Sequence, residues 1–325
     1  MPDTPCITFL YSTSYDLSLD LLIRRLGAER VFRFNLDLWR DYSLQIEANR
    51  FSITDPTGRS VSCDRVAKFL WRKPLTTQAL FPDRSVPREQ VYQEEELAYA
   101  MREVWNRMYY DGRAVLIDPM SDDLAGKLTQ ARIARACFPV PAWRFVAGSA
   151  EALEAGRESV VKSLTSQRVG AKSVLYTTRV QEEQLDPASP WMIQDFVAAD
   201  RDVTVVVVRD ALFAFEFDRG MLPERVIDWR QARAQNPVQT WRPHRLPAAV
   251  TASIRQFMDA MALHYGRLDF LLSGETYYFL EVNPNGEWGW LDPLGEAGIQ
   301  DTLAEELSPD TPCHPLPNPR MIKVP

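Results

Sequence analysis

The sequence predicts a mixed α/β (α+β) protein with more than one domain, for three reasons. Over residues 1–120, short apolar segments alternate with segments of helical periodicity, which favours an α/β layer with a partly parallel sheet. After residue 198, apolar segments come in pairs joined by turn residues, which is typical of hairpins in a mixed sheet. With 325 residues, the chain is long enough for two or three domains.

Residues 1–120 are expected to form the first domain. Apolar residues at helical spacing predict a helix over Leu17–Leu26, which Gly27 ends, and a longer helix over Tyr92–Tyr109. Strands are predicted at Ile7–Tyr11, Val31–Asn35, Tyr42–Ala48, Arg50–Thr54, Val66–Leu70 and Ala114–Ile117. The domain should end at residues 118–120, Asp-Pro-Met.

Residues 121–197 follow as a shorter region of the same mixed type. Ser121 is a suitable N-cap for a helix that runs to about Cys137, and Ser149–Ala155 predicts a second, short helix. Strands are predicted at Trp143–Val146, Ser159–Lys162, Ser173–Val180 and Trp191–Val197.

Residues 198–307 contain two predicted hairpins and two helices. The strands are Val203–Val208 with Ala211–Phe217, and Arg267–Leu272 with Tyr277–Val282. The helices are the amphipathic segment Ala249–Tyr265 and a short one over Ile299–Leu307. The proline-rich tail, residues 308–325, should be extended or mobile.

Composition excludes several classes of protein. A formal net charge of −7 argues against a general nucleic-acid binder, and no apolar run approaches the length of a membrane span. The N-terminus lacks the basic region of a signal peptide. The cysteines (Cys6, Cys63, Cys137 and Cys313) are widely spaced and are interpreted as free thiols of a cytoplasmic protein. The 3 histidines are too scattered for a zinc site, and a Ser-His-Asp triad has no local signature.

The last hairpin carries the most informative polar residues. Because side chains alternate along a strand, Glu281 and Asn283 point to the same face. Asp269 joins them if it lies opposite Glu281, which should require a loop of three or five residues instead of four. Such oxygen ligands suit Mg²⁺. An ordinary turn at residues 283–286 is about equally supported, but an unpaired Glu281 after Tyr-Tyr-Phe-Leu would be unusual, which favours the metal site.

Several cations also have two interpretations. Lys162 lies in an apolar strand and must reach an anion or solvent, whereas Lys127 on a helix would be solvated by default. The arginines of residues 219–245 are either a solvated basic surface or a cluster that meets phosphate and carboxylate groups, with about equal support. Arg72 and Lys73 end a strand, where we expect two solvated cations.

Asp269 in one strand, followed by Glu-x-Asn after the next, is similar to the metal signature of the ATP-grasp superfamily. The longer string FLEVNPNGEWGWL resembles ATP-grasp ligases of the microviridin or graspetide type, which mature ribosomal peptides and are related to RimK-like and glutathione-synthetase-like ligases. The segments GKLTQARIA and VVKSL, and the Asp-Trp-Arg of residues 228–230, match the same family. The resemblance covers the chain from Trp71 to Trp290.

The resemblance implies an ATP-grasp fold. Its parts would be an N-terminal pre-ATP-grasp, leader-binding domain (1–120), a small central domain (121–197) and a C-terminal mixed-sheet domain with the metal site (198–307), followed by the tail (308–325). ATP would lie between the central and C-terminal domains.

The resemblance also implies roles for individual residues. Lys127 and Lys162 would contact the phosphates of ATP. Adenine would be held near the linking strand by Gln194, Asp195, Phe196 and Val197. Asp269, Glu281 and Asn283 would hold two Mg²⁺ ions.

Three arginines are catalytic candidates by the same resemblance. Arg230 would meet the γ-phosphate or an acyl phosphate, with Arg219 and Arg201 as further candidates. The chain departs from the family at two places. Gly170 is alone in a loop that is often glycine-rich in relatives, and residues 202–204 are Asp-Val-Thr where many relatives have D-x-R-V-T, so that the arginine is displaced to Arg201.

The implied function is that of an ATP-dependent ligase. It would activate Asp or Glu side chains of a ribosomal precursor peptide as acyl phosphates and join them to Ser, Thr or Lys as ester or amide crosslinks. The partner would be the leader and core of that peptide, without nucleic acid or membrane; a homodimer is an open option. Two alternatives remain, a ligase that joins a small carboxylate or amino acid to an amine, and a non-catalytic ATP-dependent peptide-binding protein.

Overall fold

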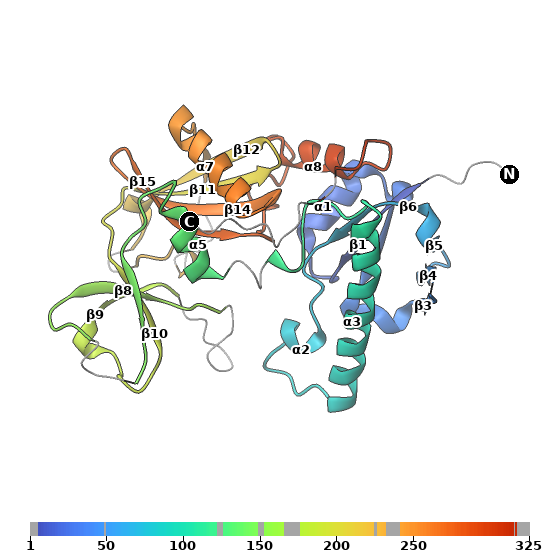
Figure 1. Ribbon diagram of the computed structural model, residues 1–325, viewed down its shortest axis with the longest axis horizontal. Coiled ribbons are helices and arrows are strands. Elements are labelled where there is room, and N and C mark those ends of the chain that lie inside the picture. The colour runs from blue at the N-terminus through green and yellow to red at the C-terminus, as the bar shows by residue number, and fades with distance from the viewer. Residues whose placement is uncertain are drawn as a thin grey trace.

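The computed structural model describes residues 6–48, 50–121, 126–148, 153–165, 176–223, 226–231, 241–314 and 316. They form an N-terminal lobe, a small central lobe and a C-terminal lobe built on a large sheet (Figure 1).

The N-terminal lobe is built on a parallel sheet of strand order β2-β1-β6, formed by β1 (Ile7–Ser12), β2 (Val31–Asn35) and β6 (Val66–Trp71). Strand β1 is buried along its whole length because helices cover both faces of the sheet. One face packs against α1 (Leu17–Leu26) and the other against α3 (Arg88–Tyr110). The remaining elements are η1 (Ala28–Arg30), η2 (Leu36–Asp41), β3 (Ser43–Ile46), β4 (Phe51–Thr54), β5 (Ser60–Ser62), η3 (Cys63–Arg65) and α2 (Thr77–Leu80).

Most elements predicted for this lobe are confirmed, including the partly parallel arrangement and both long helices. The predicted strand Ala114–Ile117 is wrong. It forms only an isolated bridge between Ala114 and Phe69, because Leu116 has a positive φ of 61°, which interrupts the extended run. Strand β5, which completes a small antiparallel sheet with β3 and β4, was not predicted.

The central lobe is an antiparallel sheet of order β7-β10-β8-β9. Its strands are β7 (Trp143–Val146), β8 (Glu158–Lys162), β9 (Thr178–Gln181) and β10 (Trp191–Asp195), with η5 (Glu182–Gln184) after β9. Helix α5 (Lys127–Ala134) begins after Gly126 and ends before Cys137, so the helix predicted from Ser121 is wrong in extent. The short helix predicted at Ser149–Ala155 and the loop around Gly170 lie largely outside the described residues.

The C-terminal lobe is an antiparallel sheet of order β13-β12-β11-β14-β15. The strands are β11 (Arg201–Val208), β12 (Ala211–Asp218), β13 (Arg242–Pro243), β14 (Tyr265–Ser273) and β15 (Thr276–Asn283), with η6 (Arg219–Met221) after β12. One face packs against α5 and α7 (Ala248–Ala260). The predicted helix over Ala249–Tyr265 is too long, because Ala262 has a φ of 53° and Tyr265 already begins β14.

The end of the chain returns to the N-terminal lobe. Helix α8 (Ile299–Leu307) lies beside α1 (Figure 1). The buried ammonium of Lys68 donates to the Glu306 carbonyl and to Thr311 Oγ1, each at 2.6 Å. Leu316 is buried in the core of the N-terminal lobe. The described part of the tail, residues 308–314 and 316, is therefore bound to the protein, whereas its prolines predicted an extended or mobile segment.

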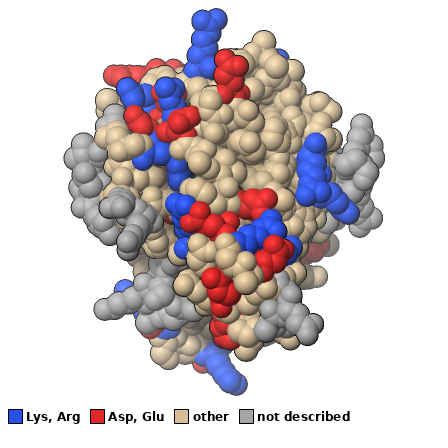
Figure 2. All heavy atoms as spheres, turned by 90° about the vertical axis from the view of Figure 1, so that its left-hand side faces the viewer, with Lys and Arg blue, Asp and Glu red and all other residues tan. Residues whose placement is uncertain are grey.

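On the face that Figure 2 shows, acidic and basic side chains lie side by side. None of the helices in the described residues is long and apolar enough to cross a membrane.

Candidate active site

A β-bulge brings the predicted metal ligands together. Pairing from the turn runs regularly to Phe270 opposite Phe279, but the next pair is Asp269 opposite Glu281, so Leu280 is an extra residue in β15. The turn itself holds only Gly274 and Glu275. The expectation that an odd loop would align the two carboxylates is wrong, because the bulge supplies the single extra residue instead.

The side chains around Asp269 fix its position on the sheet. Its carboxylate accepts from Thr204 Oγ1 at 2.7 Å and lies 3.2 Å from the Arg267 guanidinium. Arg267 is paired with Asn283 across β14 and β15, and Asn283 Oδ1 accepts from the backbone N–H of Asn285 at 3.1 Å. Asp269, Glu281 and Asn283 therefore share one face of the sheet.

Both predicted phosphate-binding lysines act on Glu281. The Lys127 ammonium lies 3.2 Å from Glu281 Oε2 and donates to the Ser163 carbonyl at 2.8 Å. Burial lowers the pKa of the Lys162 ammonium to about 8, although Glu281 opposes this effect. Burial by itself would raise the pKa of Glu281, but the charges of Lys127 and Lys162 outweigh it and hold that pKa below its ordinary value. Lys162 comes from β8 of the central lobe, whereas Lys127 and Glu281 come from α5 and β15, which pack together in the C-terminal lobe.

Gln130 connects α5 to β15, and no role was predicted for it from the sequence. Its Oε1 accepts from the backbone N–H of Val282 at 2.9 Å, and the side chain is buried. The contact lies between Glu281 and Asn283 along β15. A polar side chain one helical turn after Lys127 was the available signal.

Arg230 lies beside this cluster on a buried carboxylate. Its Nε and Nη2 donate to the two oxygens of Asp228 at 2.9 and 2.7 Å, while its side chain remains 52% exposed. The bond to Asp228, together with the charges of Glu281 and Asp269, raises the pKa of Arg230. The guanidinium is thus held in place with part of its surface open to a ligand.

Arg219 supports a second buried carboxylate on the same face. Its Nη1 donates to both oxygens of Asp202 at 3.0 and 2.8 Å. Burial raises the pKa of Asp202 to about 6, and Arg219 offsets part of that effect.

Arg201 is not part of this arrangement. It lies 2.7 Å from Glu216, whose carboxylate also accepts from His244 Nδ1 at 2.6 Å. Along β11, Asp202 and Thr204 share the face of Asp269, and Arg201 points to the other face because neighbouring side chains alternate. The structure therefore separates Arg201 from the other two arginine candidates.

Three tryptophans pack against one another close to Arg230. The ring centroids of Trp229, Trp241 and Trp290 are 5.3 to 5.4 Å apart in each pair. Trp288 is buried in the core between the lobes. These contacts agree with a packing role for the Trp288–Trp290 segment.

The predicted adenine contacts lie at the end of β10. Gln194 is buried and paired with Trp143 and Val160 on either side. The Asp195 carboxylate lies 2.5 Å from Arg157, and the Arg179 guanidinium lies 4.1 Å from the centre of the Phe196 ring.

A cavity of about 470 Å³ lies just beyond Val197. Its walls include Ala199, Asp200, Asp218, Arg219, Gly220 and Leu222. Arg219, which pairs with Asp202, is part of the wall.

The residues present fit a hard divalent cation. Asp269, Glu281 and Asn283 offer oxygen ligands on one face, and each carboxylate side chain is 26% exposed. Among the described residues, no group of three or more His, Cys, Asp or Glu could hold a metal alone. This donor set matches Mg²⁺, which takes few protein ligands and shares substrate phosphates.

Arg72 and Lys73 are not the solvated strand end that their residue types predict. Arg72 is 2% exposed, with Asp16 at 2.8 Å and Glu287 at 3.0 Å. Lys73 Nζ lies 2.6 Å from Glu287. The prediction fails because Glu287 lies more than 200 residues away in sequence, where local reasoning does not reach.

Comparison with known proteins gives a clear result for structure only. No family model matches the sequence, and no curated protein matches it. The chain is similar to the Chryseobacterium gregarium RiPP-associated ATP-grasp ligase in complex with ADP and a leader and core peptide, with a TM-score of 0.77, 21% identity, and coverage of 95% of this chain and 98% of that one.

Two further structures are similar over the same extent. Macrocyclase MdnC from Microcystis aeruginosa MRC, bound with precursor peptide MdnA, has a TM-score of 0.74 and 22% identity, covering 93% of this chain and 99% of that one. ATP-grasp ligase PsnB, complexed with a phosphomimetic variant of its minimal precursor, Mg and ADP, has a TM-score of 0.68 and 16% identity, with coverage of 93% and 98%.

The chain therefore has the ATP-grasp fold, as its sequence motifs imply. The similarity extends over more than nine-tenths of this chain for each of the three ATP-grasp structures.

Proposed function

We propose that this protein is an ATP-dependent, ADP-forming ligase that crosslinks a ribosomal precursor peptide. The observation that carries the proposal is the convergence of Lys127, Lys162 and Arg230 on the paired carboxylates of Asp269 and Glu281, within an ATP-grasp fold. Cations around paired carboxylates are what a nucleotide triphosphate and its metal require.

Each part of the site has a separate task in this proposal. Lys127 and Lys162 bind the phosphates, and the backbone of residues 194–197 holds adenine next to the 470 Å³ cavity. Asp269, Glu281 and Asn283 hold Mg²⁺, which neutralises charge on the phosphates when bound. The number of ions, two by the resemblance, stays a prediction.

The reaction then needs two displacements. A substrate carboxylate oxygen attacks the γ-phosphorus, the bond to ADP breaks, and an acyl phosphate forms. A hydroxyl or amine attacks the acyl carbon, phosphate leaves with the electron pair, and the nucleophile loses its proton. Arg230, held by Asp228, and Arg219, held by Asp202, are the guanidinium groups that would stabilise the negative charge on the transferred phosphoryl group. No nucleophile of the protein takes part.

The peptide substrate is supported by the structural neighbours. The similar structures contain leader and core or precursor peptides, and this chain covers nearly all of each neighbour. We therefore propose that the acceptor carboxylates are Asp or Glu side chains and that the nucleophiles are Ser, Thr or Lys side chains. We also propose the domain boundaries 1–120, 121–197 and 198–307, and a cytoplasmic location, which the wide spacing of the 4 cysteines supports.

The test is mass spectrometry of a candidate precursor peptide, encoded beside the gene, after incubation with enzyme, ATP and Mg²⁺. Loss of water from the peptide that requires ATP supports the proposal. An unchanged peptide, with ADP released only on addition of small carboxylates, would replace it with a small-molecule ligase. Nucleotide binding without either change would identify a non-catalytic peptide-binding protein.

A further inference from the structure

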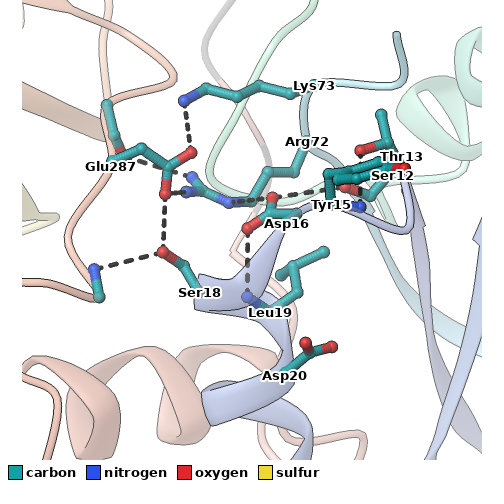
Figure 3. Close-up of polar contacts among 12 residues, drawn as sticks. Ser12, Thr13, Tyr15, Asp16, Ser18, Leu19, Asp20, Arg72, Lys73 and Glu287 are labelled. Atoms are coloured by element: carbon teal, nitrogen blue, oxygen red, sulfur yellow. Dashed lines mark hydrogen bonds and ion pairs between the residues drawn. The ribbon is translucent and has the colours of Figure 1, made fainter. Parts of the chain in front are cut away.

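A cluster of charged side chains joins the N-terminal lobe to the segment that follows β15. Arg72 Nε lies 2.8 Å from Asp16, and its Nη2 lies 3.0 Å from Glu287 (Figure 3). Lys73 Nζ and Ser18 Oγ contact the same Glu287 carboxylate at 2.6 and 2.7 Å. Arg72 is 2% exposed, so this contact is a buried link between lobes.

The cluster lies at the edge of the parallel sheet where ligands commonly bind in folds of this kind, at the carboxyl ends of the strands. Strand β1 is central in the order β2-β1-β6. The chain leaves β1 toward β2 and leaves β6 toward Ala114, which bridges to Phe69 on the other side of β6, so these two connections run in opposite directions. Asp16 follows β1 and Arg72 follows β6, so both stand at the carboxyl ends of the strands that flank this switch point. In this protein, residues 284–287, the loop after β15, contact this edge of the sheet.

Backbone contacts hold that loop as firmly as the charges. The Gly286 carbonyl accepts from Tyr265 OH at 2.6 Å and from Arg72 Nη1 at 3.4 Å. A Cβ atom at Gly286 would lie 2.5 Å from Arg267 Cβ, so the loop can pass over β14 only with glycine there. At the same place Asn285 is buried, and its Oδ1 has no hydrogen-bond partner among the described residues.

Arg267 continues the chain of contacts to the metal ligands. Its Nη1 donates to the Glu287 carbonyl at 3.2 Å, and its Nη2 lies 3.2 Å from the Asp269 carboxylate. A continuous path therefore runs from Asp16 and Arg72 through Glu287 and Arg267 to Asp269.

Backbone strain supports a functional reason for this arrangement. Lys73 has a φ of 46° and precedes Pro74, although a side chain disfavours the left-handed region and a following proline restricts the backbone further. In this conformation Lys73 Nζ lies 2.6 Å from Glu287. Strain of this kind persists where the surrounding structure fixes a residue, and is concentrated at functional sites.

We propose that Arg72 and Glu287 are positioning residues of the metal site, through which the N-terminal lobe sets the geometry of Asp269 and of the loop after Asn283. The inference rests on the proposed function, since it assigns these residues to the Mg²⁺–nucleotide site. Mutation of residues that hydrogen-bond to metal ligands commonly lowers metal affinity about 10- to 100-fold.

The experiment is a Mn²⁺ titration of the full chain with ADP, read from the electron paramagnetic resonance signal of free Mn²⁺. The variants are Arg72→Met and the milder Glu287→Gln, which keeps the shape of the side chain. Arg209→Met is the matched control, because Arg209 is a half-buried arginine paired with Glu306 at 2.5 Å, away from residues 284–287. ADP binding without metal and thermal unfolding are measured on every variant.

We expect Mn²⁺ affinity to fall by about tenfold or more in Arg72→Met and Glu287→Gln, with metal-free ADP binding and the Arg209→Met variant unchanged. Wild-type Mn²⁺ affinity in a folded Glu287→Gln variant would overturn the inference. An equal loss of metal-free ADP binding would also overturn it, because the effect would then be general. Absence of Mn²⁺–ADP binding by the wild type would refute the proposed function itself.

Discussion

Asp269 lies directly opposite Glu281 across β14 and β15, at the pairing position that Leu280 would occupy in a regular hairpin. The bulge at Leu280 also changes which face each residue uses. Phe279 and Val282 both pack in the core beneath the sheet, although only three positions separate them. Glu281 and Asn283 consequently point to the opposite face, toward Lys127. The bulge is the device that converts a core strand into a ligand-bearing one.

Loss of the Asp269 carboxylate should abolish turnover. Asp269→Asn removes a predicted metal ligand, so ATP-dependent water loss from the peptide should fall by about 100-fold or more. Asp210→Asn, an exposed acid in the turn between β11 and β12 of the same sheet, serves as the control. Equal turnover by Asp269→Asn and Asp210→Asn would contradict the metal assignment.

Nucleotide affinity should depend on the protonation of Lys162. Its pKa is lowered to about 8, so the ammonium that attracts phosphate is lost as pH rises through 8. The Kd for ATP should therefore be low and constant below pH 8 and should rise above it. Lys162→Arg keeps its charge and should bind ATP without this pH dependence. Fluorescence titration with a labelled nucleotide on both sides of pH 8 measures both, and identical pH profiles would rule out the role.

Arg230 and Arg201 should behave differently although both were candidates from sequence. Arg230→Lys keeps a positive charge but loses the fork that contacts Asp228, and kcat/KM for the peptide should fall by about 100-fold. Arg201→Met should leave peptide turnover as in the wild type, because Arg201 lies on the other face of the sheet. Steady-state release of ADP gives both values. An equal loss of kcat/KM in Arg230→Lys and Arg201→Met would contradict the assignment of a catalytic role to Arg230 alone.

Acid should weaken the link between the lobes through Glu287. Although burial opposes it, the charges of Arg72 and Lys73 hold the pKa of Glu287 at about 2, against an ordinary value of 4.5. Because the folded-state pKa is lowered, this stabilisation is complete above pH 4.5 and is lost as pH falls toward 2.

The full shift corresponds to about 3 kcal/mol, which solvent screening of a side chain that is 40% exposed should reduce to about 1 kcal/mol. Glu287→Gln should unfold with a shallower acid dependence than the wild type. Urea unfolding at neutral pH and at pH values between 4.5 and 2 makes the comparison, and parallel curves would show that Glu287 does not titrate in this way.

Local pattern was sufficient for most strands and helices, whereas the ATP-grasp fold was predicted from the resemblance of the motifs to that superfamily. It placed Glu281, Asn283, Lys127 and Lys162 in elements that do converge, because periodicity of two or 3.6 is a local property. The parity of β15 held a further signal. Regular alternation would place Glu281 and Asn283 on the same face as the apolar Tyr277 and Phe279, and apolar Val282 on the opposite face. A shift of register between Phe279 and Glu281 is needed to bury all three apolar side chains on one face.

Other features depend on partners that are distant in sequence. Arg72 gives no sign of its burial until Glu287 and Asp16 are known to meet it. Arg201 was assigned by its distance from Thr204 along the chain, and one position along a strand reverses the face. Helix α7 ends at Ala260 because Ala262 has a positive φ, and alanine in the sequence gives no indication of such a conformation.

The return of the chain end to the N-terminal lobe has a consequence for synthesis on the ribosome. Thr8 donates to the Leu307 carbonyl, the Lys68 ammonium is satisfied by Glu306 and Thr311, and Leu316 completes the first core. Until these residues emerge, Lys68 would be a buried charge without partners, which is costly. The first lobe to be translated therefore reaches its native state only after residues 299–316 have been made, and nascent chains halted before residue 299 should remain protease-sensitive in β1 and β6.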